Sequence, residues 1–231
     1  HVTCEDAVVE IQRARDRGLP IFGETCLQYL MLTVDELARP GFEGAKYVCS
    51  PPLREQRHQE VLYKALRQGA LQGISTDHCP FNYKDQKELG LGDFTKIPNG
   101  LPAIEHRLTL LYDRGVRGGH MSVVDLVRHC SWGPARIFGL DRKGAIAPGF
   151  DADIVVFDPE VKHTISAATH QMNVDYDPFE GWEVTGKPRF VLSRGETVYA
   201  DGKIVSEPGR GRYVKRSIFE PALPSREPVA A

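Results

Sequence analysis

Short apolar segments alternate with amphipathic segments through residues 3–142, and this alternation limits the folds open to the chain. The amphipathic segments predict helices, and the apolar ones predict single strands between them. Strands separated by helices of about 10–15 residues are typical of βα units, which assemble into a parallel sheet. Helices are expected at residues 3–17, 55–69, 102–114, 122–130 and 134–139, the fourth capped by Ser122 and the fifth opened by Pro134. Strands are expected at residues 20–24, 46–50 and 71–76. We therefore expect an α/β fold.

The longest connection of this region follows the strand predicted at residues 71–76. It covers residues 77–101 and contains Asp77, His78 and Asn99. In a (β/α)8 barrel of the TIM type, the chemistry is carried by loops at the C-terminal ends of the strands. The sequence thus predicts part of such a barrel, with a functional site on these loops.

The pattern changes near residue 143, which we take as a domain boundary. Residues 1–142 are interpreted as a portion of the barrel, and residues 143–205 as a small β domain. Within it, the Asp201-Gly202 pair predicts a tight hairpin turn between TVYA and KIV. Residues 206–231 have few apolar anchors and are expected to form a C-terminal tail that contacts a partner subunit or is partly disordered.

The chain begins with His1 rather than Met. The residues that follow already predict a helix, with a capping box from Thr3 to Asp6. A start at the edge of a helix predicts that this chain is the C-terminal part of a longer protein.

Charge and composition exclude several classes of protein. The 29 basic and 31 acidic side chains give a net charge of −2, so no excess of positive charge favours a nucleic acid or an anionic membrane as partner. No apolar run approaches the roughly 18 residues of a membrane span. The five cysteines are scattered, without CxxC spacing. This usage predicts reduced thiols in a cytoplasmic protein.

Asp77 and His1 are the candidate metal ligands. Asp77 stands at the end of a predicted buried strand. A carboxylate there has a functional role, as a metal ligand or a general base, or a structural one, as the cap of a turn. His1 precedes a predicted helix, so it too is expected at the C-terminal end of a strand. Imidazole and carboxylate are the usual zinc ligands of hydrolases, but a catalytic zinc needs about three protein ligands. The others are expected upstream of His1.

Ser50 and Asn99 are the candidate substrate-binding residues. Ser50 lies at a predicted strand end before Pro51-Pro52, and Asn99 lies in the turn Ile97–Gly100. Exposed backbone N–H and C=O groups at such turns suit a small polar amide. The alternative is two ordinary turns.

The other polar residues are weaker candidates for a functional site. His78 is expected to point away from Asp77, in a supporting or structural role, and His58 is expected to be solvated or to pack locally. No histidine or asparagine partner supports Cys79 as a nucleophile. The remaining histidines show no pairing that indicates a site; they are His106, His120, His129, His163 and His170.

Five segments together resemble the hydantoinase/dihydropyrimidinase family of cyclic amidohydrolases. They are HVTCEDA, CSPPLRE, GISTDHCPFN, KELGLGDFTKIPNG and GAIAPGFDADIVVFDP. The resemblance implies a (β/α)8 barrel with a small β-sandwich-like domain, two divalent metal ions, most often zinc, and a homo-oligomer, either dimer or tetramer. It implies that His1 binds one metal, that Asp77 binds the other and moves the proton, and that the backbones of Ser50 and Asn99 hold the substrate. The chain lacks a His-x-His pair and a recognisable bridging carboxylated lysine, so these are expected upstream.

The reaction implied by the resemblance is hydrolytic ring opening of 5-substituted hydantoins or 5,6-dihydropyrimidines to N-carbamoyl amino acids. A metal-bridged hydroxide would attack, with Asp77 as the proton shuttle. Two alternatives stay open. One is an amidohydrolase of the allantoinase or dihydroorotase type, and the other is a non-catalytic dihydropyrimidinase-like scaffold.

Overall fold

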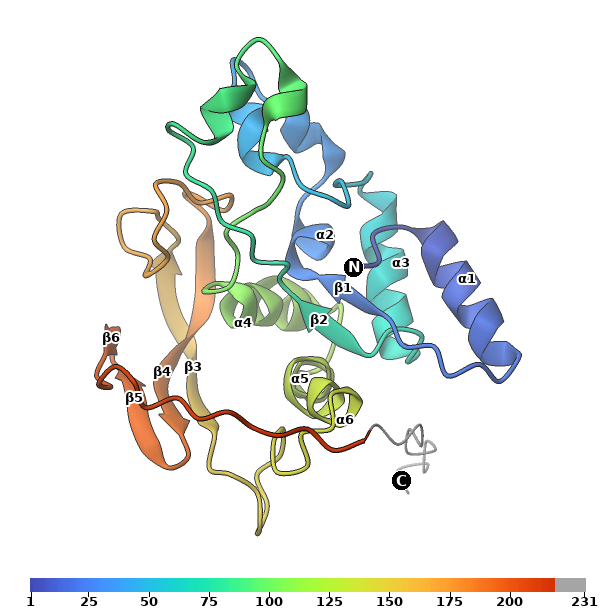
Figure 1. Ribbon diagram of the computed structural model, residues 1–231, viewed down its shortest axis with the longest axis vertical. Helices are drawn as coiled ribbons and strands as arrows, with labels where there is room; N and C mark the ends of the chain where they lie inside the picture. Colours follow the sequence, from blue (N-terminus) through green and yellow to red (C-terminus); the bar gives the residue numbers. More distant parts are fainter. Residues whose placement is uncertain (219–231) are drawn as a thin grey trace.

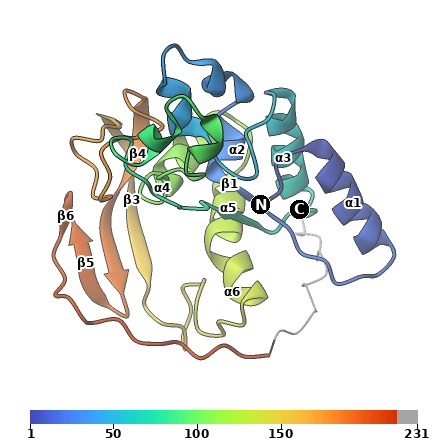
Figure 2. The same ribbon diagram turned by 45° about the horizontal axis from the view of Figure 1, so that its top comes forward.

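The computed structural model describes residues 1–218 (Figures 1 and 2). The α-helices are α1 (Glu5–Asp16), α2 (Leu27–Met31), α3 (Arg57–Arg67), α4 (Arg107–Leu110), α5 (Val123–Val127) and α6 (Gly133–Ile137). The strands are β1 (Glu24–Cys26), β2 (Gly73–Ser75), β3 (Ile154–Thr164), β4 (Glu183–Ser193), β5 (Glu196–Ala200) and β6 (Lys203–Ile204). Helices α4 to α6 lie between the sheet of β3 to β6 on one side and α1 and α3 on the other.

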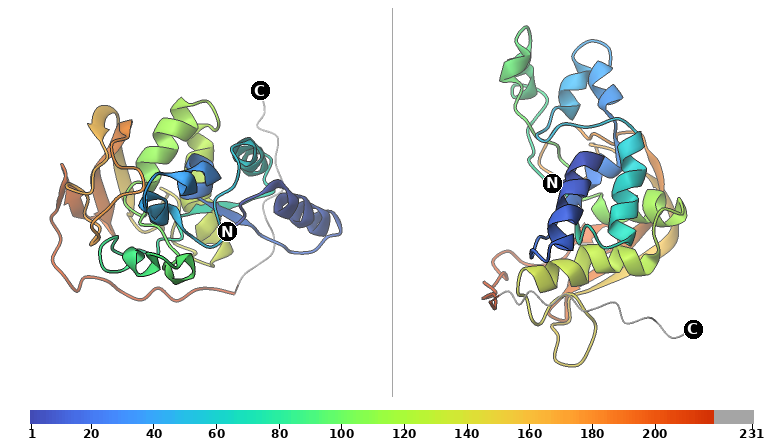
Figure 3. Two further views of the ribbon diagram at one scale, coloured as in Figure 1. Left: turned by 90° about the horizontal axis from the view of Figure 1, so that it is seen from above. Right: turned by 90° about the vertical axis from the view of Figure 1, so that its right-hand side faces the viewer.

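Shorter helical turns complete the chain. Four are 3-10 turns: η1 (Val34–Ala38), η2 (Glu43–Tyr47), η3 (Lys87–Gly90) and η4 (Phe94–Lys96). Two are π-helical: η5 (Leu111–Arg117) and η6 (Arg128–Trp132). Turns η5 and η6 extend α4 and α5, so α5, η6 and α6 run as one long helical segment (Figure 3).

Strands β1 and β2 pair in parallel, which confirms the predicted βα character. Cys26 lies opposite Ser75, so both strands end at the same edge. The first strand begins at Glu24, later than the predicted residues 20–24. The strand predicted at residues 46–50 is wrong, because backbone groups there close local turns: Val48 N–H donates to the Ala45 carbonyl at 3.3 Å.

The first helix begins at Glu5, and the predicted capping box is wrong. Cys4 occupies the N-cap position without a side-chain hydrogen bond. The imidazole of His58 supplies the acceptor instead, because its Nδ1 receives the Glu5 backbone N–H at 3.2 Å. His58 is therefore buried between α1 and α3, so of the two expectations for it local packing is confirmed and solvation is wrong. Thr3 is also buried and accepts a hydrogen bond from Arg54.

The later helices agree in part with the sequence. The helix predicted at residues 102–114 begins only at Arg107, and Pro102 lies before it in an irregular segment. Ser122 caps α5, as predicted, through a capping box with Asp125. Pro134 occupies the first turn of α6, also as predicted.

Strands β3, β4, β5 and β6 form one antiparallel sheet in that order. The hairpin predicted at Asp201-Gly202 is confirmed, since Ala200 pairs with Lys203 and both turn residues have positive φ, 45° and 89°. Within residues 1–218 this is a single sheet, so a sandwich with a second layer stays a prediction.

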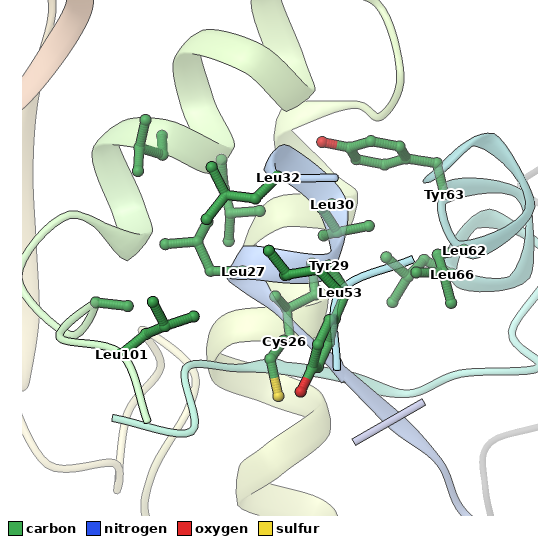
Figure 4. Packing of buried hydrophobic residues seen from close by; sticks show 14 of the residues in the cluster. Cys26, Leu27, Tyr29, Leu30, Leu32, Leu53, Leu62, Tyr63, Leu66 and Leu101 are labelled. Carbon is green, nitrogen blue, oxygen red and sulfur yellow. The ribbon is translucent and has the colours of Figure 1, made fainter. Parts of the chain in front are cut away.

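The core lies between β1, β2 and the helices around them (Figure 4). Leu27 and Leu30 of α2 and Leu62 and Leu66 of α3 all belong to this buried cluster. Burying a leucine side chain contributes about 1.5–3 kcal/mol. The core therefore fixes the β1–β2 edge, on which the candidate site lies.

The tail is anchored where it leaves the sheet. Arg210 Nη2 donates to the Ser193 carbonyl at 2.8 Å and to Glu196 at 3.0 Å. Tyr213 and Ile218 are exposed, and residues 219–231 of the predicted tail lie outside the described residues. Among the helices of residues 1–218, none has the length and apolar character that crossing a bilayer requires.

Candidate active site

The edge at which β1 and β2 end brings the two predicted metal ligands together. Residues 1–3 run beside β1, because the Val2 N–H donates to the Glu24 carbonyl at 2.8 Å and Thr25 Oγ1 donates to the Val2 carbonyl at 2.7 Å. Asp77 follows β2 by two residues. The N-terminus consequently lies next to β1 near the middle of the molecule (Figure 1).

The imidazole of His1 stands between two carboxylates. Its Nδ1 lies 2.6 Å from Glu24 Oε1, and its Nε2 lies 3.2 Å from Asp77 Oδ1. Both side chains of the His1–Asp77 pair are about one-third exposed, with 34% and 28% of their surface accessible. A metal-binding histidine commonly gives its second ring N–H to a carboxylate, which sets its tautomer and orientation. Glu24 is placed for that task, which leaves Nε2 directed toward Asp77.

Cys26 offers a competing ligand set. Ligand atoms of His1, Glu24 and Cys26 all lie within 4.8 Å of one another. Burial raises the pKa of the Cys26 thiol to about 12, and the thiolate is the form that binds metal. Its Sγ also lies 3.1 Å from Ser75 Oγ. These observations favour the Asp77 carboxylate over the Cys26 thiol as the group that would bind metal together with His1.

Asp77 adopts a backbone conformation that aspartate tolerates better than most residues. Its φ is +46°, in the left-handed region. Non-glycine residues in that region concentrate at functional sites, where the surrounding structure holds them. Here the turn carries the chain from β2 out to the Asp77 carboxylate, which is about one-third exposed.

Ser50 and Asn99 lie on neighbouring segments. The Gly100 N–H donates to the Val48 carbonyl at 3.0 Å, which joins the two turns. The second turn also contacts the segment after Asp77, because the Cys79 N–H donates to the Leu101 carbonyl at 3.3 Å. Ser50 and Asn99 are exposed, and within residues 1–218 their own backbone groups make no hydrogen bond. Those groups are thus free to meet a ligand.

Comparison with known proteins identifies the family. Residues 9–198 match the model of the amidohydrolase family. The chain belongs to the amidohydrolase family.

The similar proteins are hydantoinases and dihydropyrimidinases. A D-hydantoinase of Geobacillus stearothermophilus is 53% identical over 99% of this chain and 49% of its own length. The crystal structure of a dihydropyrimidinase from Brevibacillus agri NCHU1002 superposes with a TM-score of 0.93 at 55% identity, over 95% of this chain and 48% of that one. An L-hydantoinase from Arthrobacter aurescens gives 0.86 at 32% identity, over 94% and 47%. The chain spans about half the length of these relatives, and its α/β arrangement fits part of a TIM-barrel enzyme.

Two further histidines have structural roles, and only that of His78 was expected from the sequence. His106 Nε2 lies 2.6 Å from Asp177 Oδ2 in a buried pair, which ties the start of α4 to the segment before β4. The pair is structural, so it leaves unchanged the expectation that His106 belongs to no functional site. His78 supports the loop, because its Nδ1 accepts the Ala103 N–H at 3.2 Å.

Sequence reasoning missed Glu24 and Lys87. Glu24 could have been found by the rule that found Asp77, since it too is a carboxylate on a predicted strand. Lys87 gave no signal: it stands in the polar run KDQKELG, which is typical of a solvated surface, yet its side chain is fully buried. The five cysteines are free thiols, as predicted.

Proposed function

We propose that the complete protein opens the rings of small cyclic amides, 5-substituted hydantoins or 5,6-dihydropyrimidines, to give N-carbamoyl amino acids. The observation that carries this proposal is the convergence of His1 Nε2 and Asp77 Oδ1 at 3.2 Å on the edge formed by β1 and β2. The similarity to proteins named hydantoinase and dihydropyrimidinase supports the substrate class.

His1 and Asp77 fit part of the ligand set of a metal centre. His1 offers Nε2, with Nδ1 already engaged by Glu24, and Asp77 offers a carboxylate without another hydrogen-bond partner in residues 1–218. Imidazole nitrogen and carboxylate oxygen are ligands that zinc accepts, and the remaining ligands would come from other parts of the complete protein. Two bound divalent ions would supply an activated water and polarise the scissile carbonyl.

Asp77 would move the proton. Its carboxylate would accept the proton of the attacking water as the new C–O bond forms, and then donate it to the ring nitrogen as the C–N bond breaks. Ser50 and Asn99 would present backbone N–H and C=O groups to the cyclic amide and thereby orient its carbonyl.

The remaining parts of the proposal concern the assembly. We propose a homo-oligomer, dimer or tetramer, in the cytoplasm. Exposed apolar residues on β6 and the tail support a subunit contact; they are Ile204, Val205, Tyr213 and Ile218. A small β-sandwich-like domain would form if a further strand layer covers the sheet of β3 to β6.

The substrate test compares two groups of cyclic amides on the complete protein. We expect turnover of dihydrouracil and of a 5-substituted hydantoin to exceed that of allantoin and dihydroorotate. Metal analysis should give about two zinc ions per subunit. Faster opening of allantoin or dihydroorotate would favour that branch of amidohydrolases, and a protein with neither metal nor turnover would be a scaffold.

Replacing Glu24 by alanine should weaken metal binding about 10- to 100-fold, because His1 loses the carboxylate that orients its ring. The measurement is the zinc dissociation constant of the complete protein, by competition with a chelator. Glu10→Ala is the matched control, since Glu10 pairs with Arg13 at 2.5 Å on the surface of α1. Equal affinity in both variants would contradict the role of Glu24.

A further inference from the structure

A lysine is buried beneath the two turns that carry Ser50 and Asn99. The side chain of Lys87 is completely inaccessible, an unusual state for a residue that is almost never fully buried unless paired. Its Nζ donates to three backbone carbonyls: Pro98 at 2.7 Å, Gly100 at 2.9 Å and Val48 at 3.0 Å. Within residues 1–218, Lys87 has no carboxylate partner.

The three carbonyls belong to the segments proposed to hold the substrate. Pro98 and Gly100 are the direct neighbours of Asn99, and Val48 precedes Ser50 by two residues. The Val48 carbonyl accepts from both Lys87 and the Gly100 N–H. One ammonium group thus joins segments that are some fifty residues apart in the sequence.

We propose that Lys87 is a positioning residue that sets the spacing between the Ser50 and Asn99 backbones and so determines how tightly a small cyclic amide binds. This inference rests on the proposed function. An ammonium group has three N–H donors, and here each has one carbonyl acceptor. A side chain without these donors would leave buried carbonyls unsatisfied, so the two turns would separate or admit water.

The surroundings of Lys87 make its charge state relevant. Burial lowers the pKa of Lys87 to about 8, while the nearby thiols of Cys49 and Cys79 oppose that shift. The ring of Phe81 lies 6.0 Å from Nζ. A neutral amine has two N–H donors and would release one of the three carbonyls. Substrate binding should therefore weaken as the pH rises through the pKa of Lys87.

The test is Lys87→Met in the complete protein, with Lys96→Met as control. Lys96 belongs to the same loop, but it is exposed and pairs with Asp93 at 3.3 Å. For Lys87→Met we expect KM for dihydrouracil or a hydantoin to rise at least about tenfold, with a smaller change in kcat, because binding shared by ground and transition states is lost. Hydrogen exchange of residues 97–101 should accelerate in Lys87→Met and stay unchanged in Lys96→Met.

Failure of this inference can be distinguished from failure of the proposed function. If the unsubstituted protein opens no ring, the proposed function fails, and hydrogen exchange still decides whether Lys87 holds the turns. If the unsubstituted protein is active, an unchanged KM in Lys87→Met overturns the inference. Should Lys87→Met not fold, Lys87→Arg takes its place: its planar guanidinium keeps the charge but not the three contacts, so KM should rise and lose its dependence on pH above about 8. A KM of Lys87→Arg that matches the unsubstituted protein would equally overturn it.

Discussion

Asp77→Asn should lower kcat of the complete enzyme by about 10²- to 10⁴-fold, the usual contribution of a positioned general acid–base group. The amide has nearly the shape of the carboxylate but neither accepts the proton of the attacking water nor returns it to the leaving nitrogen. The backbone should be undisturbed, because asparagine tolerates the +46° φ at this position at least as well as aspartate does. Steady-state kinetics and metal content, measured on the same preparation, give the result.

The matched control for this variant is Asp85→Asn. Asp85 is exposed, stands in the same long loop and also has a positive φ, +66°. It should keep normal turnover, which removes backbone conformation as an explanation. If Asp77→Asn loses activity but keeps its metal, the defect lies in proton transfer. Near-normal turnover of Asp77→Asn would remove Asp77 from the mechanism.

The parts of the fold that sequence predicted are those that depend on local chemistry. Ser122 and the Asp201-Gly202 turn were readable because a capping side chain and a two-residue hairpin act through their immediate neighbours. The strand predicted at residues 46–50 failed for the opposite reason. Its apolar pattern suits a strand, but the Val48 N–H closes a local turn, and the Val48 carbonyl is held by Gly100 and Lys87, which are distant in the sequence.

The same distinction holds in the site. His1 and Asp77 could be proposed because each follows or precedes a recognisable element, and the parallel pairing of β1 with β2 then brings them together. The burial of Lys87 and of His58 could not be read from composition, because both stand among charged residues. Lys87 is buried against three backbone carbonyls, and His58 against the backbone N–H at the start of α1. Nearly every residue carries such backbone groups, so the sequence does not show which of them will meet a buried side chain.

Gly100→Ala should destabilise the turn that carries Asn99 more than any other glycine substitution in the long loop between β2 and α4. A Cβ at this position would lie 2.2 Å from the Cys79 carbonyl oxygen and 2.8 Å from Cys79 Cβ, and the φ of +151° is one that L residues rarely adopt. Backbone strain costs about 1–3 kcal/mol and overpacking a further 1–3 kcal/mol. The free energy of unfolding should therefore fall by about 2–6 kcal/mol.

The variant Gly92→Ala separates the effect of backbone strain from that of the steric clash at Gly100. Gly92 lies in the same loop with a φ of +80°, but nothing is within 4 Å of its added Cβ. It should lose only about 1–2 kcal/mol, the usual cost of a left-handed conformation, and leave KM unchanged. In Gly100→Ala the displaced turn should also weaken the hydrogen bond to Val48 and raise KM. Equal stability and equal KM in the two variants would mean that the turn moves freely, and that a fixed Asn99 backbone is not what binds the substrate.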